Sequence, residues 1–243
     1  MTSPATPLLE IEGLRTGYGE TEVLHGISLV VASDETVVML GPNGHGKSTL
    51  LRAISALLPV RSGRVTFDGT LLAGKPADAI VGLGLIHIPQ GDLLFPEMTV
   101  QENLLMGAYR AEAWSRRSER LEYVAAIFPR LGERGKQLAR TLSGGERRML
   151  AIGRGLMSNA KLLMIDEPSL GLAPVVIDEL YDRIAEIKQT GKAILLVEES
   201  ASRVEGLADR LYLLENGEIV RQGDPSALLT DGALLQTLSL IHI

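Results

Sequence analysis

The sequence predicts an α/β protein in which helices cover both faces of a mostly parallel β-sheet. Two observations carry this prediction: short, continuously apolar segments recur along the chain, and helical patterns separate them. Strands of parallel sheets have this apolar character because both of their faces are buried. Helices between such strands provide the crossover connections that parallel pairing requires. The 243 residues suffice for one large domain or two small ones.

The first forty residues have the character of strands. Segment 8–16 alternates between apolar and polar residues, segment 22–32 is β-branched and alternates in part, and segment 36–40 is continuously apolar. The glycine-rich segment 41–48 then leads into a helical pattern. Segment 63–69 is predicted to be a strand that ends in an Asp-Gly turn.

A helical stretch from about 92 to 160 is predicted as an insertion into the sheet domain. Within it, Thr99 and Glu102 form a capping-box pattern before one helix, and 115–128 is predicted to form another. Further strands, a helix and a final hairpin follow the insertion; the strands are at 161–165, 192–197 and 210–215, the helix at 173–187 and the hairpin at 215–223.

Composition limits the kind of protein this can be. The net charge of −6 argues against a dominant nucleic-acid-binding surface, so no nucleic-acid partner is expected. The absence of cysteine excludes disulfides and thiolate metal sites. Apolar runs fall short of the roughly 18–20 residues that span a bilayer, so any membrane association is expected to go through a partner.

The last six residues, 238–243, form an apolar end with no evident packing role. One set of codons for LSLIHI reads as a transposon-end sequencing adaptor. We therefore interpret 238–243 as a non-native tail and expect residues 1–237 to form a single domain.

Residues 41–48, GPNGHGKS, match the phosphate-binding pattern G-x-x-x-x-G-K-[ST], with a strand before and a helix after. Backbone N–H groups of such a P-loop curve around phosphate oxygens, and the helix dipole adds positive potential. Lys47 is expected to reach the β- and γ-phosphates of ATP, and the Ser48 hydroxyl to bind Mg²⁺. The predicted nucleotide-binding residues here are Gly41, Pro42, Asn43, Gly44, His45, Gly46, Lys47, Ser48 and Thr49.

Segment 162–167, LLMIDE, is an apolar strand that ends in two carboxylates. Asp166 is placed to hold Mg²⁺, directly or through water. Glu167 is placed to polarise an attacking water, as a general base or by orienting it. We expect the strands at 36–40 and 162–166 to be neighbours, so that both motifs meet at the carboxyl edge of the sheet.

Residues Ser143 to Glu146 form a second capping box, so a helix is predicted to start at Ser143. Two adjacent glycines, Gly144 and Gly145, expose backbone N–H groups at this helix N-terminus, which suits a second phosphate contact. We therefore predict that Ser143, Gly144, Gly145 and Glu146 bind nucleotide. The helix has an apolar face made of Met149, Leu150, Ile152, Leu156 and Met157.

With LSGGE ahead of LLMIDE, nearly the whole chain resembles the ATP-binding subunits of ABC transporters. The resemblance implies a P-loop NTPase fold with a RecA-like core, an N-terminal antiparallel β subdomain and an inserted helical subdomain. It also implies a head-to-tail dimer, of identical or different subunits, with two ATP molecules. Each ATP would lie between residues 41–48 of one subunit and 143–146 of the other.

The resemblance assigns further residues. Tyr18 matches the aromatic residue that stacks on adenine, and Gln90 matches the glutamine that senses the γ-phosphate and Mg²⁺. Lys47, Gln90 and Glu167 would be catalytic, and Ser48, Gln90 and Asp166 would hold the metal. Residues 93–95, after Gln90, would form part of a groove that receives a helix of the membrane permease.

Segment 169–174, SLGLAP, resembles the smaller ATPase of branched-chain amino acid importers. This implies an ATPase on the cytoplasmic face of the inner or plasma membrane, peripheral to permease subunits and served by a solute-binding protein. Segment 169–174 lacks the usual aspartate, and Gln90 stands where this branch often has glutamate. A urea or short-chain amide importer ATPase stays open, as does a soluble ABC ATPase without a transporter. A GTPase is disfavoured because no N-K-x-D-type motif is present.

One position departs from the family pattern. Glu199 aligns with a residue that is histidine in most ABC ATPases and glutamine in the branched-chain branch, where it contacts the γ-phosphate. An ionised carboxylate cannot donate to phosphate and repels it. Three alternatives remain: Glu199 is protonated, or it turns away so that water or Ser200 takes its place, or it acts only indirectly.

Overall fold

The structure is a computed structural model that describes residues 7–201, 204 and 206–229; the interpreted tail 238–243 lies outside the described residues. One of its two sheets is antiparallel, with strand order β2-β1-β4-β5. Its strands are β1 (Leu9–Tyr18), β2 (Thr21–Val31), β4 (Ser62–Phe67) and β5 (Thr70–Leu71). The prediction of an N-terminal antiparallel β region is confirmed.

The second sheet has six strands in the order β10-β9-β3-β8-β7-β6 and is parallel except for β10. Its strands are β3 (Thr36–Leu40), β6 (Leu85–Ile88), β7 (Leu162–Asp166), β8 (Ala193–Glu198), β9 (Arg210–Glu215) and β10 (Glu218–Gly223). The predicted mostly parallel sheet and the final β9–β10 hairpin are confirmed.

The expectation that β3 and β7 are neighbours is wrong. Strand β8 lies between them and pairs in parallel with both. Chain order and apolar pattern reveal which segments are strands, but the crossover connections decide which strands pair. The carboxyl ends of β3, β8 and β7 therefore form three adjacent positions at one edge of the sheet.

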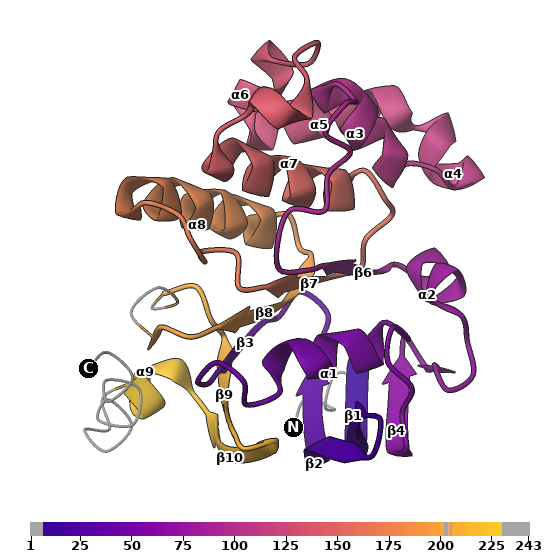
Figure 1. The fold of residues 1–243 in the computed structure, drawn as a ribbon, viewed down its shortest axis with the longest axis vertical. Helices are drawn as coiled ribbons and strands as arrows, with labels where there is room; N and C mark the ends of the chain where they lie inside the picture. Colours follow the sequence, from indigo (N-terminus) through magenta and orange to yellow (C-terminus); the bar gives the residue numbers. More distant parts are fainter. Residues whose placement is uncertain (1–6, 202–203, 205, 230–243) are drawn as a thin grey trace, which may run out of the picture.

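Helices cover both faces of the six-stranded sheet, with α7 and α8 on one side and α1 on the other, between the two sheets (Figure 1). The long helices are α1 (Lys47–Ile54), α3 (Val100–Gly107), α5 (Arg117–Ile127), α7 (Gly144–Leu156) and α8 (Pro174–Gln189). The short ones are α2 (Ala77–Leu83), α4 (Ala111–Ser115), α6 (Pro129–Glu133), the 3-10 turn η1 (Ala139–Thr141) and α9 (Pro225–Leu229).

Strand β3 illustrates how the sheet separates two apolar cores. Its alternate residues Val38 and Leu40 belong to the core beneath α7 and α8. Val37 and Met39 belong to the core that also contains Leu50 of α1. All five residues of β3 are buried, which is the reason for its continuous apolar sequence.

Elements α2 and β6 were not predicted. Their combined sequence, residues 77–88, is an apolar run without a clear period, so no helix or strand pattern stands out. Gly84, at φ 99°, separates the two elements in the left-handed conformation that glycine adopts readily. Strand β6 pairs with β7 and leads directly to Gln90.

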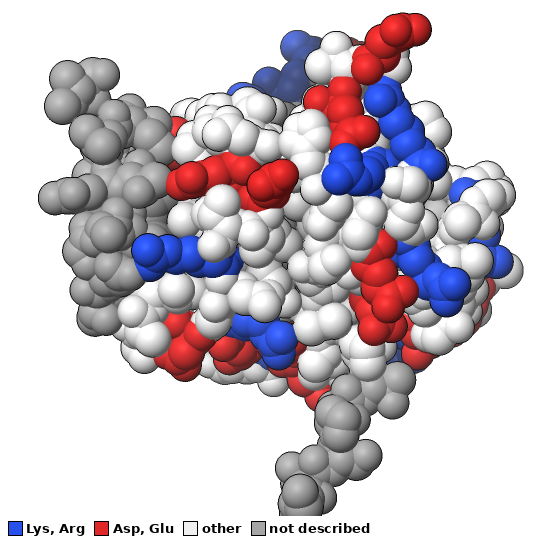
Figure 2. Space-filling view, turned by 90° about the horizontal axis from the view of Figure 1, so that it is seen from below, with Lys and Arg blue, Asp and Glu red and all other residues white. Residues whose placement is uncertain are grey.

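The surface view in Figure 2 shows acidic and basic side chains interspersed on the face seen from below. Among the described residues, none of the helices has the length and apolar character needed to cross a bilayer.

Candidate functional site

The loop of residues 41–46 connects β3 to α1 and depends on glycine at two crowded positions. A Cβ on Gly41 would lie 2.3 Å from the Leu214 carbonyl oxygen, and one on Gly46 would lie 2.6 Å from Leu24 Cδ2. Gly46 also has φ 107°, in the left-handed region. Packing and backbone conformation together therefore require the glycines of the motif.

His45 attaches this loop to the turn between β9 and β10. Its carbonyl oxygen accepts a hydrogen bond from Gly217 N at 3.1 Å, and its Nδ1 accepts one from Asn216 N at 3.0 Å. The imidazole thus points toward the turn.

Lys47 is 3% exposed and its ammonium group is fully engaged. Nζ donates to the carbonyl oxygens of Gly41 at 2.8 Å and Pro42 at 3.0 Å. It also forms an ion pair with Glu167 Oε1 at 3.0 Å. The first residue of α1 is thereby joined to the residue that follows β7, across the intervening strand β8.

Ser48 and Asp166 are also in contact, because the Ser48 hydroxyl donates to Asp166 Oδ1 at 3.0 Å. Burial raises the pKa of Asp166, and the charge of Glu167 raises it further, while the Ser48 hydrogen bond and the charge of Lys47 oppose the shift. Two oxygen atoms of this kind, side by side, suit a hard divalent cation such as Mg²⁺.

Glu167 is 6% exposed and has a backbone φ of 44°, unusual for a residue with a side chain. Its N–H donates to the Val197 carbonyl of β8 at 3.0 Å, which holds this conformation. Its Oε2 accepts a hydrogen bond from Gln90 Nε2 at 3.0 Å. Lys47 and Gln90 therefore each hold one oxygen of this carboxylate.

These groups surround a single cavity of about 270 Å³. The residues that line it are Asn43, Gly44, Gly46, Lys47, Ser48, Thr49, Gln90 and Glu167. Gln90 lies about 40 residues from the loop along the sequence, and Glu167 lies about 120 residues away. The folded chain thus brings half of the predicted nucleotide-binding residues and catalytic residues, including all three catalytic ones, to one place.

Tyr18 lies at the end of β1 and is not among the described residues that line this cavity. Its side chain is 44% exposed, and its hydroxyl accepts a hydrogen bond from Arg52 Nη1 at 3.1 Å. Although partial burial raises the pKa of Tyr18, hydrogen bonds with Thr49 and Arg52 outweigh it and lower the pKa. The ring is available for contact at the side of α1.

The predicted capping box of Ser143 is present. Ser143 Oγ accepts from Glu146 N at 3.3 Å, and Glu146 Oε2 accepts from Ser143 N at 2.9 Å. A Cβ on Gly145 would lie 2.2 Å from Val176 Cγ1 of α8, whereas Gly144 has no neighbour closer than 3.5 Å. Close packing of α7 against α8 therefore requires glycine at position 145, for which the sequence alone indicated only phosphate binding. At position 144, packing does not require glycine.

Segment 143–146 and the cavity are separate within one chain. In the described part of the protein, the cavity lining includes no residue of 143–146. Figure 1 places the start of α7 on the opposite side of the six-stranded sheet from α1. The two predicted groups of nucleotide ligands are thus not assembled within a single chain.

The two glutamates at the end of β8 point to different partners. Glu199 Oε2 accepts a hydrogen bond from Asn43 Nδ2 at 3.0 Å. Glu198 is 1% exposed, and its Oε1 accepts from Tyr181 OH at 2.6 Å and from Ser169 N at 3.3 Å. Sequence reasoning gave Glu198 no role; its signal was a carboxylate that directly continues a buried strand.

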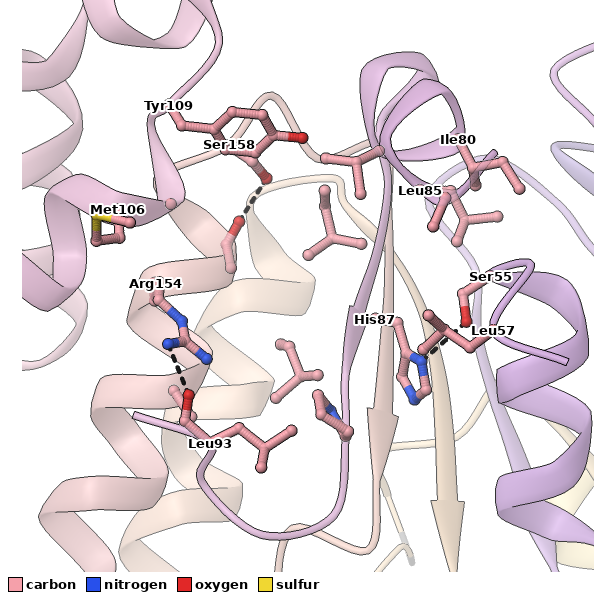
Figure 3. Close-up of a pocket in the computed structure, with 18 of the residues that line it drawn as sticks. Ser55, Leu57, Ile80, Leu85, His87, Leu93, Met106, Tyr109, Arg154 and Ser158 are labelled. Carbon is pink, nitrogen blue, oxygen red and sulfur yellow. Dashed lines mark hydrogen bonds between the residues drawn. The ribbon is translucent and has the colours of Figure 1, made fainter. Parts of the chain in front are cut away.

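A larger cavity of about 450 Å³ lies beside β6, with the end of α1 and α2 on one side and α3 and α7 on the other (Figure 3). Leu93 and Phe95 line it and are 68% and 43% exposed. Leu94, which was expected to face the same groove, instead packs against the core. Other labelled residues around it are Ser55, Leu57, Ile80, Leu85, His87, Met106, Tyr109, Arg154 and Ser158.

A phosphate-binding loop, a lysine, a carboxylate and a glutamine line one cavity, and a second carboxylate, Asp166, accepts a hydrogen bond from Ser48 in its wall; together they define a P-loop nucleotide-binding protein. A model of the ABC transporter family matches residues 24–170, and the chain belongs to this family. ATP-binding domains of the family bind and hydrolyse ATP, dimerise and work with membrane permease subunits. The predicted ABC ATPase class is therefore confirmed.

The chain is similar to curated relatives over nearly its whole length. It is 42% identical to the high-affinity branched-chain amino acid transport ATP-binding protein BraG of Pseudomonas aeruginosa, over 92% of this chain and 96% of the relative. It is 36% identical to the probable branched-chain amino acid transport ATP-binding protein LivF of Archaeoglobus fulgidus, over 91% and 94%.

A similar fold is found in a crystal structure of the ADP conformation of an ATP-binding cassette of an ABC transporter. The TM-score is 0.84 at 28% sequence identity, and the match covers 97% of this chain and 99% of the other.

Proposed function

We propose that this chain is the ATPase subunit that energises an importer of branched-chain amino acids. The observation that carries the catalytic part is Glu167, held by Lys47 at 3.0 Å and by Gln90 at 3.0 Å beside the phosphate loop. The transported solute is inferred from the whole-length similarity to BraG and LivF.

In the proposed site, N–H groups of residues 41–49 bind the phosphates of ATP, with the dipole of α1 behind them. Lys47 exchanges its carbonyl partners for the more negative β- and γ-phosphate oxygens. Glu167 orients the attacking water and accepts its proton as the bond between the γ-phosphorus and the bridging oxygen breaks, which yields ADP and phosphate. Tyr18 stacks on adenine from the side of α1.

Residues Ser48, Asp166 and Gln90 would hold Mg²⁺. The donor set fits this ion, because Ser48 Oγ and Asp166 Oδ1 are neighbouring oxygens and the side-chain carbonyl of Gln90 is a third. When bound, the metal neutralises charge on the phosphates during transfer. Gln90 would connect two tasks, since its amide nitrogen already contacts Glu167.

The separation of segment 143–146 from the cavity of its own chain supports a head-to-tail dimer. In such a dimer, the N–H groups of Ser143 to Glu146 in one subunit complete the ATP site of the other. The partner is a second ABC ATPase, identical or different. ATP binding closes the dimer, and hydrolysis reopens it.

The cavity of about 450 Å³ in Figure 3 is an apolar groove, which is proposed to receive an apolar helical segment of the permease. Two exposed apolar residues, Leu93 and Phe95, follow Gln90 by three and five positions, so permease contact and ATP contact come from one short segment. This chain would then be peripheral on the cytoplasmic face of the inner or plasma membrane, with a solute-binding protein on the opposite side.

A urea or short-chain amide importer is the second candidate, favoured by glutamine instead of glutamate at position 90. Genes for a permease and a solute-binding protein that neighbour the gene of this chain would identify the subunits needed to reconstitute the transporter. In proteoliposomes containing the complete transporter, labelled leucine is expected to accumulate with ATP and Mg²⁺. Uptake of labelled urea without leucine uptake would replace the first candidate with the second. If no permease partner is found, so that no transporter can be assembled, a soluble ABC ATPase would be favoured instead.

A further inference from the structure

Asp92 lies two residues after Gln90 and bridges to the first turns of α7. Its Oδ2 is 3.2 Å from Arg147 Nε, and its Oδ1 is 3.5 Å from Arg148 Nε. Both arginines directly follow segment 143–146. The same carboxylate therefore contacts two successive residues of the helix that begins with the predicted cross-subunit ATP ligands.

Arg148 makes this contact more than a surface ion pair. The residue is 5% exposed, and its Nε and Nη1 have no hydrogen-bond partner among the described residues. A buried guanidinium without a nearby anion is strongly unfavourable. Both arginines also lie near the positive N-terminal end of a helix dipole, which disfavours cations. Asp92 compensates both effects.

A second attachment follows one residue later. Arg154 Nη1, two turns further along α7, donates to the Leu93 carbonyl oxygen at 2.9 Å (Figure 3). Leu93 has a φ of 42°, so the chain turns sharply between the two attachments. Segment 90–93 thus contacts Glu167 through Gln90. Through Asp92 and Leu93 it contacts α7 near both ends of that helix.

We propose that Asp92 is a positioning residue that couples the ATP site of its own chain to segment 143–146. This coupling rests on the proposed head-to-tail dimer. Asp92 is the residue that transmits a displacement at the ATP site to the start of α7. Closure of Gln90 and Glu167 around one ATP displaces segment 90–93, and Asp92 pulls the start of α7 with it. Segment 143–146 is then oriented for the ATP of the other subunit.

The test uses the full chain carrying Glu167→Gln as the parent, because this change is expected to preserve the ATP-bound dimer. Two quantities are measured with ATP and Mg²⁺: nucleotide affinity of the dilute monomer, by fluorescent ATP analogue titration, and dimer dissociation, by analytical ultracentrifugation. Asp92→Asn is expected to leave monomer affinity within about twofold and to weaken dimerisation at least about tenfold. Asp92→Glu should restore most of the dimerisation.

Arg147→Gln should weaken dimerisation in the same direction, and the Asp92→Asn/Arg147→Gln double variant should be no weaker than the stronger single variant. The matched control is Glu97→Gln. Glu97 lies a few residues after Asp92, and its Oε2 pairs with Arg140 Nε at 3.4 Å, with both side chains mostly exposed. This control should dimerise like the parent.

If Asp92→Asn folds poorly, Asp92→Leu/Arg148→Met removes both charges from the buried contact and is expected to fold, bind ATP and dimerise weakly. Parent-like dimerisation of this double variant, or of Asp92→Asn, would overturn the coupling alone. Equal losses of monomer affinity and dimerisation would also overturn it, because they indicate a general structural role. A parent that does not dimerise would overturn the proposed dimer, and the coupling with it.

Discussion

Asn43 of the phosphate loop donates a hydrogen bond from Nδ2 to Glu199 Oε2 over 3.0 Å. Asn43 Oδ1 in turn lies 3.4 Å from Lys47 Nζ. The carboxylate at the position of the usual γ-phosphate-contacting residue is therefore engaged with the loop itself. Of the three alternatives raised by the sequence, this contact agrees best with an indirect role, in which Glu199 orients Asn43.

Glu199→Gln is accordingly expected to leave the rate of ATP hydrolysis unchanged or to raise it. The new amide oxygen still accepts from Asn43, and the amide nitrogen can donate to phosphate, which a carboxylate cannot. Steady-state phosphate release with saturating Mg-ATP measures the effect, with Glu199→Ala as the variant that loses the Asn43 contact. A decrease of about tenfold or more in Glu199→Gln would reveal a positive role for the negative charge.

Lys47→Ala should weaken ATP binding by at least about 100-fold, equivalent to roughly 2.7 kcal/mol. The change removes the buried ammonium from the loop and leaves Glu167 without its cationic partner. Equilibrium titration with ATP measures it. Lys161→Ala is the control, because Lys161 is half-exposed and pairs with Asp68 on the surface. ATP affinity near that of the wild type in Lys47→Ala would refute the assignment of the loop.

Glu167→Gln should bind ATP, hydrolyse it roughly 100-fold to 10,000-fold more slowly and accumulate as a dimer. The amide retains the size of the side chain and a contact with Gln90 but cannot take a proton from water. Single-turnover hydrolysis and sedimentation provide the two readouts. Glu119→Gln, on an exposed glutamate paired with Arg116, should retain wild-type turnover. Normal turnover in Glu167→Gln would move the catalytic role to another carboxylate.

Tyr18→Ala should weaken ATP binding by about fivefold to tenfold, whereas Tyr18→Phe should change it little. The expected difference comes from stacking of the partly exposed ring on adenine, which the phenyl group retains. Competition between ATP and inorganic triphosphate separates base contacts from phosphate contacts. Equal effects of both substitutions would instead assign the role to the hydroxyl and its bond with Arg52.

Stability should depend on the titration of His87, which lies in the wall of the apolar groove. Burial, together with the nearby charge of Arg52, lowers the pKa of His87 from 6.5 to about 4. Between those values the unfolded chain binds a proton that the folded chain does not. The free energy of unfolding therefore falls as pH drops through this window, by about 2–4 kcal/mol in total.

Urea unfolding of the wild type and His87→Gln at pH 7 and pH 5 tests this expectation. The glutamine keeps a polar side chain near Ser55 Oγ, which His87 Nδ1 contacts at 3.1 Å, but it does not titrate. The His87→Gln variant should therefore lose less free energy of unfolding between pH 7 and pH 5 than the wild type. Identical losses would mean that His87 titrates alike in the folded and unfolded chains.

Much of the fold was predictable because its information is local. The glycine loop, the capping box of Ser143 and the continuously apolar strands each depend on residues close together in the sequence, and the structure contains all of them. Residues 77–88 lack such a local pattern, so α2 and β6 were missed. Leu94 is apolar like its neighbours, and only packing determined that it faces the core while Leu93 and Phe95 do not.

By itself, the sequence determined the class of protein, because phosphate binding at a strand–glycine–helix junction requires particular residues at a short, constant spacing. Only the tertiary structure decided what lies between and beside these motifs. Strand β8 lies between β3 and β7, and this position lets Glu199, which follows β8, reach Asn43. Asp92 likewise meets Arg147 and Arg148, 55 residues or more along the chain. Contacts at such separations depend on strand order and helix packing, which the whole chain sets at once.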